Sequence, residues 1–211
     1  MKTGIIFDLD GTLWDSSAAV SESWNEALAS IGVDKYTMTV DRIRGYMGQT
    51  MEAIAYDFFN EETHEEAMRL LNICADHENE YIRAHGGVLY DGLEDTLKKL
   101  KSEGYFLSVV SNCQEGYIEA FLEYHKLESY FDDTENYGRT GMEKEENIKL
   151  VVERNALDKA YYVGDTLGDY NSTMKAGLNF IHASYGFGQV PDATAVLKSI
   201  TELPEVMKGL E

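Results

Sequence analysis

Two aspartates end the first apolar run of the chain. Asp8 and Asp10 follow four residues, 4–7, that read GIIF. Side chains two residues apart in a strand point the same way, so both carboxylates are expected to project together where the strand leaves its sheet. Gly11 then allows a sharp turn and a close approach of the backbone to an anion. Carboxylates this close repel each other unless a cation or a proton lies between them, and Mg²⁺, which prefers oxygen ligands, suits the pair.

A second acidic pair follows another apolar run, YYVG at 161–164. Asp165 and Asp169 are four residues apart where a helix is expected to begin, so a helical first turn places both on one side. Aspartates near a helix N-terminus are favourable caps in any case, and for this pair alone capping is the better explanation. Together with Asp8 and Asp10, however, the four carboxylates favour a metal site.

Two further segments supply groups that bind anions. Ser111 and Asn112 end the apolar run at 105–110, and a hydroxyl and an amide there can hold a phosphoryl oxygen beside the backbone N–H groups of the next helix. Lys144 opens an expected helix, where a cation opposes the helix dipole. A nearby anion would offset that cost, so Lys144 is a candidate partner for carboxylates or phosphate, with an ordinary surface role as the alternative.

The elements that must position these residues alternate between strand and helix. Short apolar runs typical of buried parallel strands cover 4–9, 105–110, 160–163 and 178–182, with a weaker run near 130–133. Helical apolar stripes lie between them, for example at Leu93, Leu97 and Leu100. This alternation predicts an α/β fold with a doubly wound, Rossmann-like parallel sheet.

One stretch breaks the alternation. Between Ser16 and His85 the pattern indicates helices and no strand, with one apolar stripe at Val20, Trp24 and Leu28. We therefore expect a core domain of residues 1–14 and 86–211 and a helical cap domain of residues 15–85. Because the insert follows the first strand, it is expected to lie over the edge where α/β sheets bind ligands, as a lid.

Composition limits the partners and the compartment. The formal net charge of −20 argues against nucleic acid or an anionic membrane as a partner. The apolar run near the N-terminus is too short for a signal peptide, and no segment approaches the roughly 20 apolar residues of a membrane span. Cys74 and Cys113 stand in no motif and are expected to be small buried residues in a reducing compartment. We expect a cytoplasmic protein.

The order of these segments is specific. DLDGT at 8–12, VVSN at 109–112, a lysine that opens a helix and GDTLGD at 164–169 resemble the haloacid dehalogenase (HAD) superfamily of phosphatases, and most closely its phosphoglycolate-phosphatase-like subgroup. The helical insert is similar to the cap of that superfamily. The resemblance covers nearly the whole chain and implies a HAD core that carries a small helical cap.

The resemblance also implies roles for individual residues. Asp8 would be the nucleophile that forms an aspartyl-phosphate, and Asp10 the general acid for the leaving alcohol and then the base for water. Mg²⁺ would be held by Asp8, by the backbone carbonyl of Asp10 and by Asp165, while Asp169 would position a ligand water or Lys144. The phosphoryl group would be bound by a set of four residues: Leu9, Ser111, Asn112 and Lys144.

The substrate is left open. The resemblance implies a small phosphorylated metabolite, with phosphoglycolate as one candidate. A sugar phosphomutase, a nucleotidase or pyrophosphatase, and a non-catalytic binding protein on the same scaffold are the alternatives. Arg42 and Arg44 are candidates for binding a substrate carboxylate, although a solvated helix face is the favoured explanation of both. The oligomeric state is not indicated.

Overall fold

A six-stranded parallel sheet forms the centre of the protein. The structure, a computed structural model, describes residues 1–210. The strands run in the order β5-β4-β1-β6-β7-β8, and every pairing in this sheet is parallel. Their bounds are β1 (Thr3–Phe7), β4 (Phe106–Ser111), β5 (Asp133–Asn136), β6 (Lys159–Gly164), β7 (Asn179–Ala183) and β8 (Ala195–Leu197). The predicted doubly wound parallel sheet is confirmed, with β8 as an additional short edge strand.

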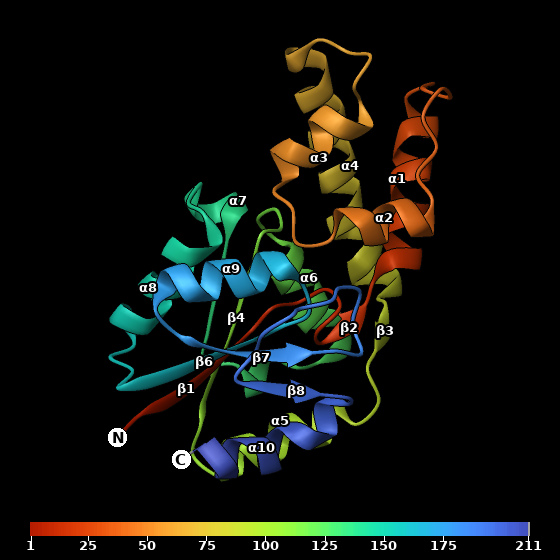
Figure 1. Cartoon of the computed structure of the whole chain (residues 1–211). Helices are drawn as coiled ribbons and strands as arrows, with labels where there is room; N and C mark the ends of the chain where they lie inside the picture. Colours follow the sequence, from red (N-terminus) through yellow and green to blue (C-terminus); the bar gives the residue numbers. More distant parts are fainter. Residues whose placement is uncertain (211) are drawn as a thin grey trace.

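Helices cover both faces of this sheet (Figure 1). Successive side chains of β1 alternate between the two layers, since Ile5 and Phe7 belong to one apolar cluster and Ile6 to the other. The Ile6 face packs against α8 (Lys144–Arg154) and α9 (Leu167–Ala176). The opposite face carries α5 (Leu93–Ser102), α6 (Tyr117–His125) and α10 (Leu203–Leu210). Three short elements complete this part of the fold: η1 (Glu128–Tyr130), α7 (Tyr137–Thr140) and η2 (Ile200–Glu202).

Four further helices stand together beyond the end of the sheet (Figure 1). They are α1 (Ser17–Ser30), α2 (Val40–Tyr46), α3 (Met51–Phe58) and α4 (His64–His85). Their apolar side chains belong to the same cluster as the Ile5 and Phe7 face of the sheet, and within it the buried Trp24 ring contacts the rings of Phe58 and Phe59. The helical content expected between Ser16 and His85 is thus present. Treating residues 15–85 as a separate domain remains a prediction.

A small antiparallel ribbon connects these helices to the sheet. Strand β2 (Trp14–Asp15) leads into α1, and β3 (Val88–Leu89) returns from α4 and pairs with it. Gly86, with φ of 67°, lies against the Tyr124 ring, where a Cβ atom would overlap with the ring. The return after α4 is therefore closely packed at Gly86.

Two expectations from composition can be compared with the fold. Both cysteines, Cys74 and Cys113, are buried and free. Within residues 1–210, no helix combines the length and apolar character that a membrane span requires.

Candidate active site

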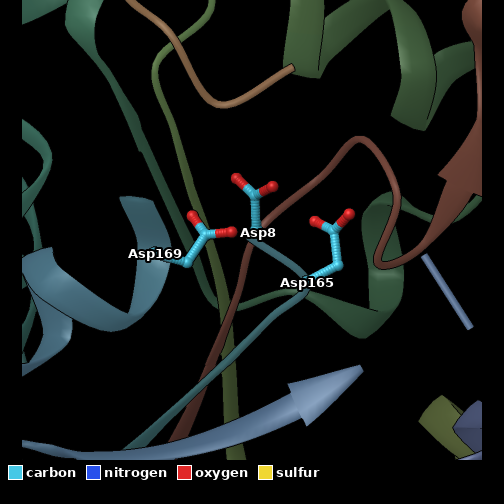
Figure 2. Close-up of side chains that lie close together, drawn as sticks. All are labelled: Asp8, Asp165 and Asp169. Carbon is cyan, nitrogen blue, oxygen red and sulfur yellow. The ribbon is translucent and has the colours of Figure 1, made fainter. Parts of the chain in front are cut away.

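Three buried aspartates meet at the carboxyl edge of the sheet. Asp8 follows β1, Asp165 follows the neighbouring β6, and Asp169 lies in the first turn of α9. One carboxylate oxygen from each lies within 4.8 Å of the others (Figure 2). They meet because neighbouring parallel strands end at the same edge, so residues 157 positions apart in the sequence become adjacent.

This cluster fits a hard divalent cation. Burial, with the charge of Asp169, raises the pKa of Asp8 to about 7 and that of Asp165 to about 8. One oxygen of Asp165, Oδ1, is buried without a hydrogen-bond partner among the described residues, while Oδ2 accepts the N–H of Phe187 at 2.7 Å. Crowded carboxylates with an uncommitted oxygen offer the ligands that Mg²⁺ prefers.

Lys144 places a positive charge inside the cluster. Its Nζ lies 2.8 Å from Asp8 Oδ1 and 2.6 Å from Asp169 Oδ1, and the side chain is buried. Burial opposes the charged form of Lys144, but the two carboxylates outweigh it and raise its pKa well above the usual value. The anion expected to offset a lysine at a helix N-terminus is thus a pair of aspartates.

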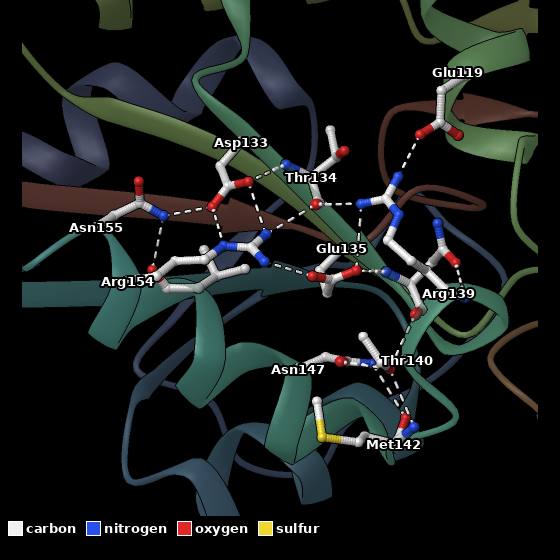
Figure 3. Close-up of polar contacts among 12 residues, drawn as sticks. Glu119, Asp133, Thr134, Glu135, Arg139, Thr140, Met142, Asn147, Arg154 and Asn155 are labelled. Carbon is white, nitrogen blue, oxygen red and sulfur yellow. Dashed lines mark hydrogen bonds and ion pairs between the residues drawn. The ribbon is translucent and has the colours of Figure 1, made fainter.

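Helix α8, which begins at this lysine, is anchored at both ends to the β5 region (Figure 3). At its C-terminal end Arg154 contacts Asp133 at 2.7 Å and Glu135 at 2.5 Å, both on β5. Near its start the Asn147 side chain accepts a hydrogen bond of 2.9 Å from the Thr140 hydroxyl. These contacts fix the helix, and therefore the lysine, relative to the sheet.

Asp169 also caps its own helix. The Thr166 N–H donates to Asp169 Oδ2 at 3.0 Å, and the Asp169 N–H donates to Thr166 Oγ1 at 3.2 Å. The two explanations offered for this residue, helix capping and membership of a charged site, therefore both apply, because its two oxygens serve different partners.

Asp10 departs from the expected arrangement. Its Oδ1 accepts hydrogen bonds from Ser16 Oγ at 2.5 Å and from the Tyr117 hydroxyl at 3.0 Å, outside the cluster of three. Asp8 and Asp10 still line one pocket, but the group of side-chain carboxylates that could hold a cation consists of Asp8, Asp165 and Asp169. The reason is that β1 ends at Phe7, so the alternation of a strand no longer governs the next residues. Burial raises the pKa of Asp10 despite these hydrogen bonds.

The residues expected to bind phosphate surround Asp8. Ser111 ends β4, the other neighbour of β1. The Asn112 side chain donates to the backbone carbonyl of Gly48, on the loop between α2 and α3, at 2.9 Å. The Leu9 side chain is completely buried in the core, so only its backbone is available to an anion.

A pocket opens beside Asp8 and Asp10, bounded by Ser111 and Asn112 on the sheet side. Its other wall comes from the four helices and the loop before α3. Residues far apart in the sequence therefore enclose the space next to Asp8.

Known proteins resemble this chain in sequence. Residues 5–183 match the family model of haloacid dehalogenase-like hydrolases. The chain belongs to this family. Among curated relatives, the phosphoglycolate phosphatase of Aquifex aeolicus is 28% identical over 199 residues, covering 90% of each chain. That of Rhodobacter capsulatus is 28% identical over 99% of this chain and 98% of its own. The recognition of the family and of its phosphoglycolate-phosphatase-like members from motif order is confirmed.

Solved structures of HAD-like hydrolases share the whole fold. A predicted phosphatase from Clostridium acetobutylicum superposes with a TM-score of 0.81 at 26% identity and covers 99% of both chains. A putative haloacid dehalogenase-like hydrolase from Bacteroides fragilis gives a TM-score of 0.83 at 21% identity, over 96% of this chain and 100% of its own. The second likeness concerns the fold alone.

Some residues around the HAD-like site were not singled out from the sequence. Tyr117 and Ser16 hold Asp10, and the Tyr162 hydroxyl lies 3.5 Å from Asp8 Oδ1. Glu78 of α4 lines the pocket. Ser16 marked only the start of the helical stretch, and the tyrosines and Glu78 lie within ordinary helix and strand patterns, so no local signal marks them.

Proposed function

We propose that this HAD-like hydrolase is a Mg²⁺-dependent phosphatase that cleaves a small phosphate monoester through an aspartyl-phosphate. The observation that supports this most strongly is the buried carboxylate of Asp8, which contacts Lys144 at 2.8 Å and also borders the pocket. A carboxylate so placed is a nucleophile that needs no base, and its neighbours compensate the charge of an incoming phosphate.

The proposed reaction has two steps. An Asp8 oxygen attacks phosphorus, the bond from phosphorus to the ester oxygen breaks, and Asp10 gives its proton to the leaving alcohol. Water then attacks the aspartyl-phosphate, Asp10 takes a proton from that water, and inorganic phosphate and free Asp8 are released. The raised pKa of Asp10 suits a group that must hold a proton in the first step and accept one in the second.

The other site residues bind and orient. The backbone of Leu9, the Ser111 hydroxyl, the Asn112 backbone and Lys144 would hold the phosphoryl oxygens. Lys144 also keeps Asp8 in position through its second contact, to Asp169. Mg²⁺ bound by Asp8, Asp165 and the Asp10 backbone carbonyl would neutralise negative charge on the transferring group, with Asp169 acting through Lys144 or a ligand water.

Residues 15–85 are proposed to act as the cap domain. The Asn112–Gly48 hydrogen bond joins the loop before α3 to the sheet edge beside the pocket that Asp8 lines. Curated relatives are named phosphoglycolate phosphatases, so phosphoglycolate is one candidate substrate. Phosphorylated metabolites of this kind favour a cytoplasmic enzyme.

The test is phosphate release from a panel of small phosphate monoesters, phosphoglycolate included, with Mg²⁺ or with EDTA. Wild type is expected to release phosphate only with Mg²⁺, and Asp8→Asn to release none while keeping its circular dichroism spectrum. Turnover by Asp8→Asn at the wild-type rate would refute the assignment of the nucleophile. EDTA-resistant turnover would refute the metal dependence.

A further inference from the structure

One acidic side chain in the pocket has no cationic partner. Glu78, on α4, lines the pocket together with Asp8 and Asp10, yet it is only 5% exposed. Within residues 1–210, none of the recorded ion pairs involves it. The rest of the wall that α1, α2, α3 and their connecting loop contribute is mainly apolar: Val20, Trp24, Ile43, Met47, Met51 and Ile54. A buried carboxylate in such surroundings is costly unless a positive charge or strong donors meet it.

The two protein groups that hold Glu78 are neutral donors. The Trp24 indole N–H donates to Oε2, and the Gln114 amide donates to Oε1 at 3.1 Å. Each oxygen of Glu78 therefore accepts one hydrogen bond from the wall and keeps lone-pair capacity for another donor. Burial, together with the charge of Asp10, raises the pKa of Glu78 to about 7, as expected for a carboxyl without a counter-charge.

The other amide and phenol groups on the pocket wall each donate a hydrogen bond within the protein. The Gln114 amide also donates to Asn79, the Asn112 amide to the Gly48 carbonyl, and the Tyr117 hydroxyl to Asp10. The Asn112 Oδ1 atom is a buried acceptor without a partner among the described residues. Beyond the phosphate-binding edge, the wall thus offers mainly acceptors and apolar surface, with the second amide N–H groups of Asn112 and Gln49 as neutral donors.

Arg42 and Arg44, the candidates for binding a substrate carboxylate, do not line the pocket. Arg42 donates to the Tyr46 hydroxyl at 2.8 Å and faces Asp57, and Arg44 pairs with Asp15 at 2.8 Å. Among the lining residues that the structure describes, every side chain of a charged type is acidic: Asp8, Asp10 and Glu78. An anionic group on the substrate, other than the phosphate itself, would meet like charges and no free cation.

We propose that the substrate is the phosphate monoester of an amino alcohol, whose ammonium group is bound by Glu78 while its carbon chain lies on the apolar wall. The proposal rests on the proposed phosphatase function and names its substrate class. An ammonium group brings the positive charge and the donors that Glu78 lacks, and its pairing with a buried carboxylate is worth more than a neutral hydrogen bond. Hydrolysis breaks the same phosphorus–oxygen bond and releases the amino alcohol and phosphate.

The test uses esters of matched size that differ only in the end group. The two-carbon set is 2-aminoethyl phosphate, 2-hydroxyethyl phosphate and phosphoglycolate, and a three-carbon set with the same end groups covers a longer reach. With Mg²⁺, kcat/KM is expected to be highest for the ammonium ester and lowest for the carboxylate ester in at least one set. The expected span is about tenfold or more. A carboxylate ester that reacts as fast as the ammonium ester in both sets overturns the proposal.

The variant Glu78→Gln keeps the shape of the side chain and removes its charge. It is expected to lower the kcat/KM ratio of ammonium ester to carboxylate ester about tenfold or more. Glu80→Gln removes the same negative charge at an exposed position of α4 and is expected to leave this kcat/KM ratio unchanged. Equal losses for all three esters in Glu78→Gln would indicate a purely structural role and refute the proposal.

A binding experiment distinguishes failure of this substrate proposal from failure of the proposed phosphatase function. Asp8→Asn with Mg²⁺ is titrated with 2-aminoethyl phosphate and phosphoglycolate by calorimetry, which needs no turnover. Tighter binding of the ammonium compound supports the selectivity even if no ester is hydrolysed by wild type, whereas tighter binding of phosphoglycolate overturns it. This comparison and the wild-type ranking also hold if Glu78→Gln does not fold.

Discussion

Lys144 contacts both Asp8 and Asp169, whose carboxylates would otherwise repel each other in the proposed active site. Its distances to Asp8 and Asp169, 2.8 and 2.6 Å, allow a charge-assisted hydrogen bond to each. Removing one member of a buried charged group leaves the others uncompensated, and this costs more than the group contributes when intact. Stability and activity should therefore both depend on this one side chain.

Lys144→Met is expected to lower kcat/KM at least ~100-fold, because the charge that faces the transferring phosphate is lost. In the absence of Mg²⁺ it should also lower the free energy of unfolding by about 3 kcal/mol, as measured by denaturant titration. Lys149→Met, at an exposed position of the same helix, is the control for the change of residue type. A Lys144→Met enzyme with wild-type kcat/KM would contradict the assigned role.

Glu78 should make stability depend on pH. Its pKa is about 7 in the folded protein and near 4.5 when exposed, so the folded state keeps a proton that the unfolded state has lost. This contribution is fully present below pH 4.5 and is lost as pH rises through 7, by about 3 kcal/mol at most. The free energy of unfolding at pH 5 minus that at pH 8 should therefore be smaller in Glu78→Gln than in wild type. An unchanged difference would show that the Glu78 pKa is not raised.

The residues proposed to carry the chemistry could largely be picked out from the sequence, but the residues that hold them in place could not. Asp8, Asp165 and Lys144 stand at the ends of expected strands or at the start of an expected helix, and the topology of an α/β sheet brings such positions together. Tyr117 reaches Asp10 across 107 residues, and Glu78 reaches Trp24 across 54. Contacts of this kind depend on how helices pack, which a single sequence does not encode locally.

At the scale of elements, the length of each strand decided what could be predicted. Four of the five expected strands correspond to β1, β4, β6 and β7, because their runs of five or six residues show their apolar character clearly, whereas the fifth overlaps β5 only at Asp133. The missed strands β2, β3 and β8 have two or three residues, too few for any periodicity. The strand expected near 130–133 lies at 133–136 in the structure. The sequence did not show its position because its residues, DTEN, are polar, and the arginines that pair with them, Arg139 and Arg154, come later in the chain.

The loop between α2 and α3 offers a test of whether the helical insert closes against the sheet domain during turnover. Gly48 has φ of 82°, and a Cβ atom there would lie 3.1 Å from Thr166 Oγ1, which caps α9. Gly48→Ala is expected to lower kcat/KM about fivefold, since closing the loop against Thr166 would cost about 1 kcal/mol more. Gly32→Ala is the matched control, because Gly32 has φ of 75° in the same helical insert and open space around it. Equal kcat/KM in the two variants would contradict a role for this contact.

At the scale of the whole molecule, a net charge of −20 surrounds a site proposed to attract a phosphate. Lys144 and a bound cation act over a few ångströms, whereas the surface charge acts on the substrate during its approach. Salt screens the long-range repulsion far more than it screens buried contacts, because the Debye length falls from about 30 Å at 0.01 M to about 10 Å at 0.1 M.

For a dianionic ester, kcat/KM at fixed Mg²⁺ is therefore expected to rise about two- to fivefold between 10 and 150 mM KCl, with kcat nearly constant. Steady-state kinetics at several salt concentrations measure this, with choline chloride in place of KCl to exclude a specific effect of potassium. A kcat/KM that falls steadily with salt would mean that local positive charge dominates the approach of the substrate.

The ribbon of β2 and β3 has a consequence for how such enzymes diversify. Trp14 pairs with Leu89 and Asp15 with Val88, so the chain departs from the sheet and comes back at adjacent points. Asp8, Lys144 and Asp165 all lie outside the segment between them. A helical module that enters and leaves through neighbouring positions can be exchanged for another by joining only two short ends. Recombination at this ribbon would therefore exchange the proposed cap and leave the three residues of the proposed active site unchanged.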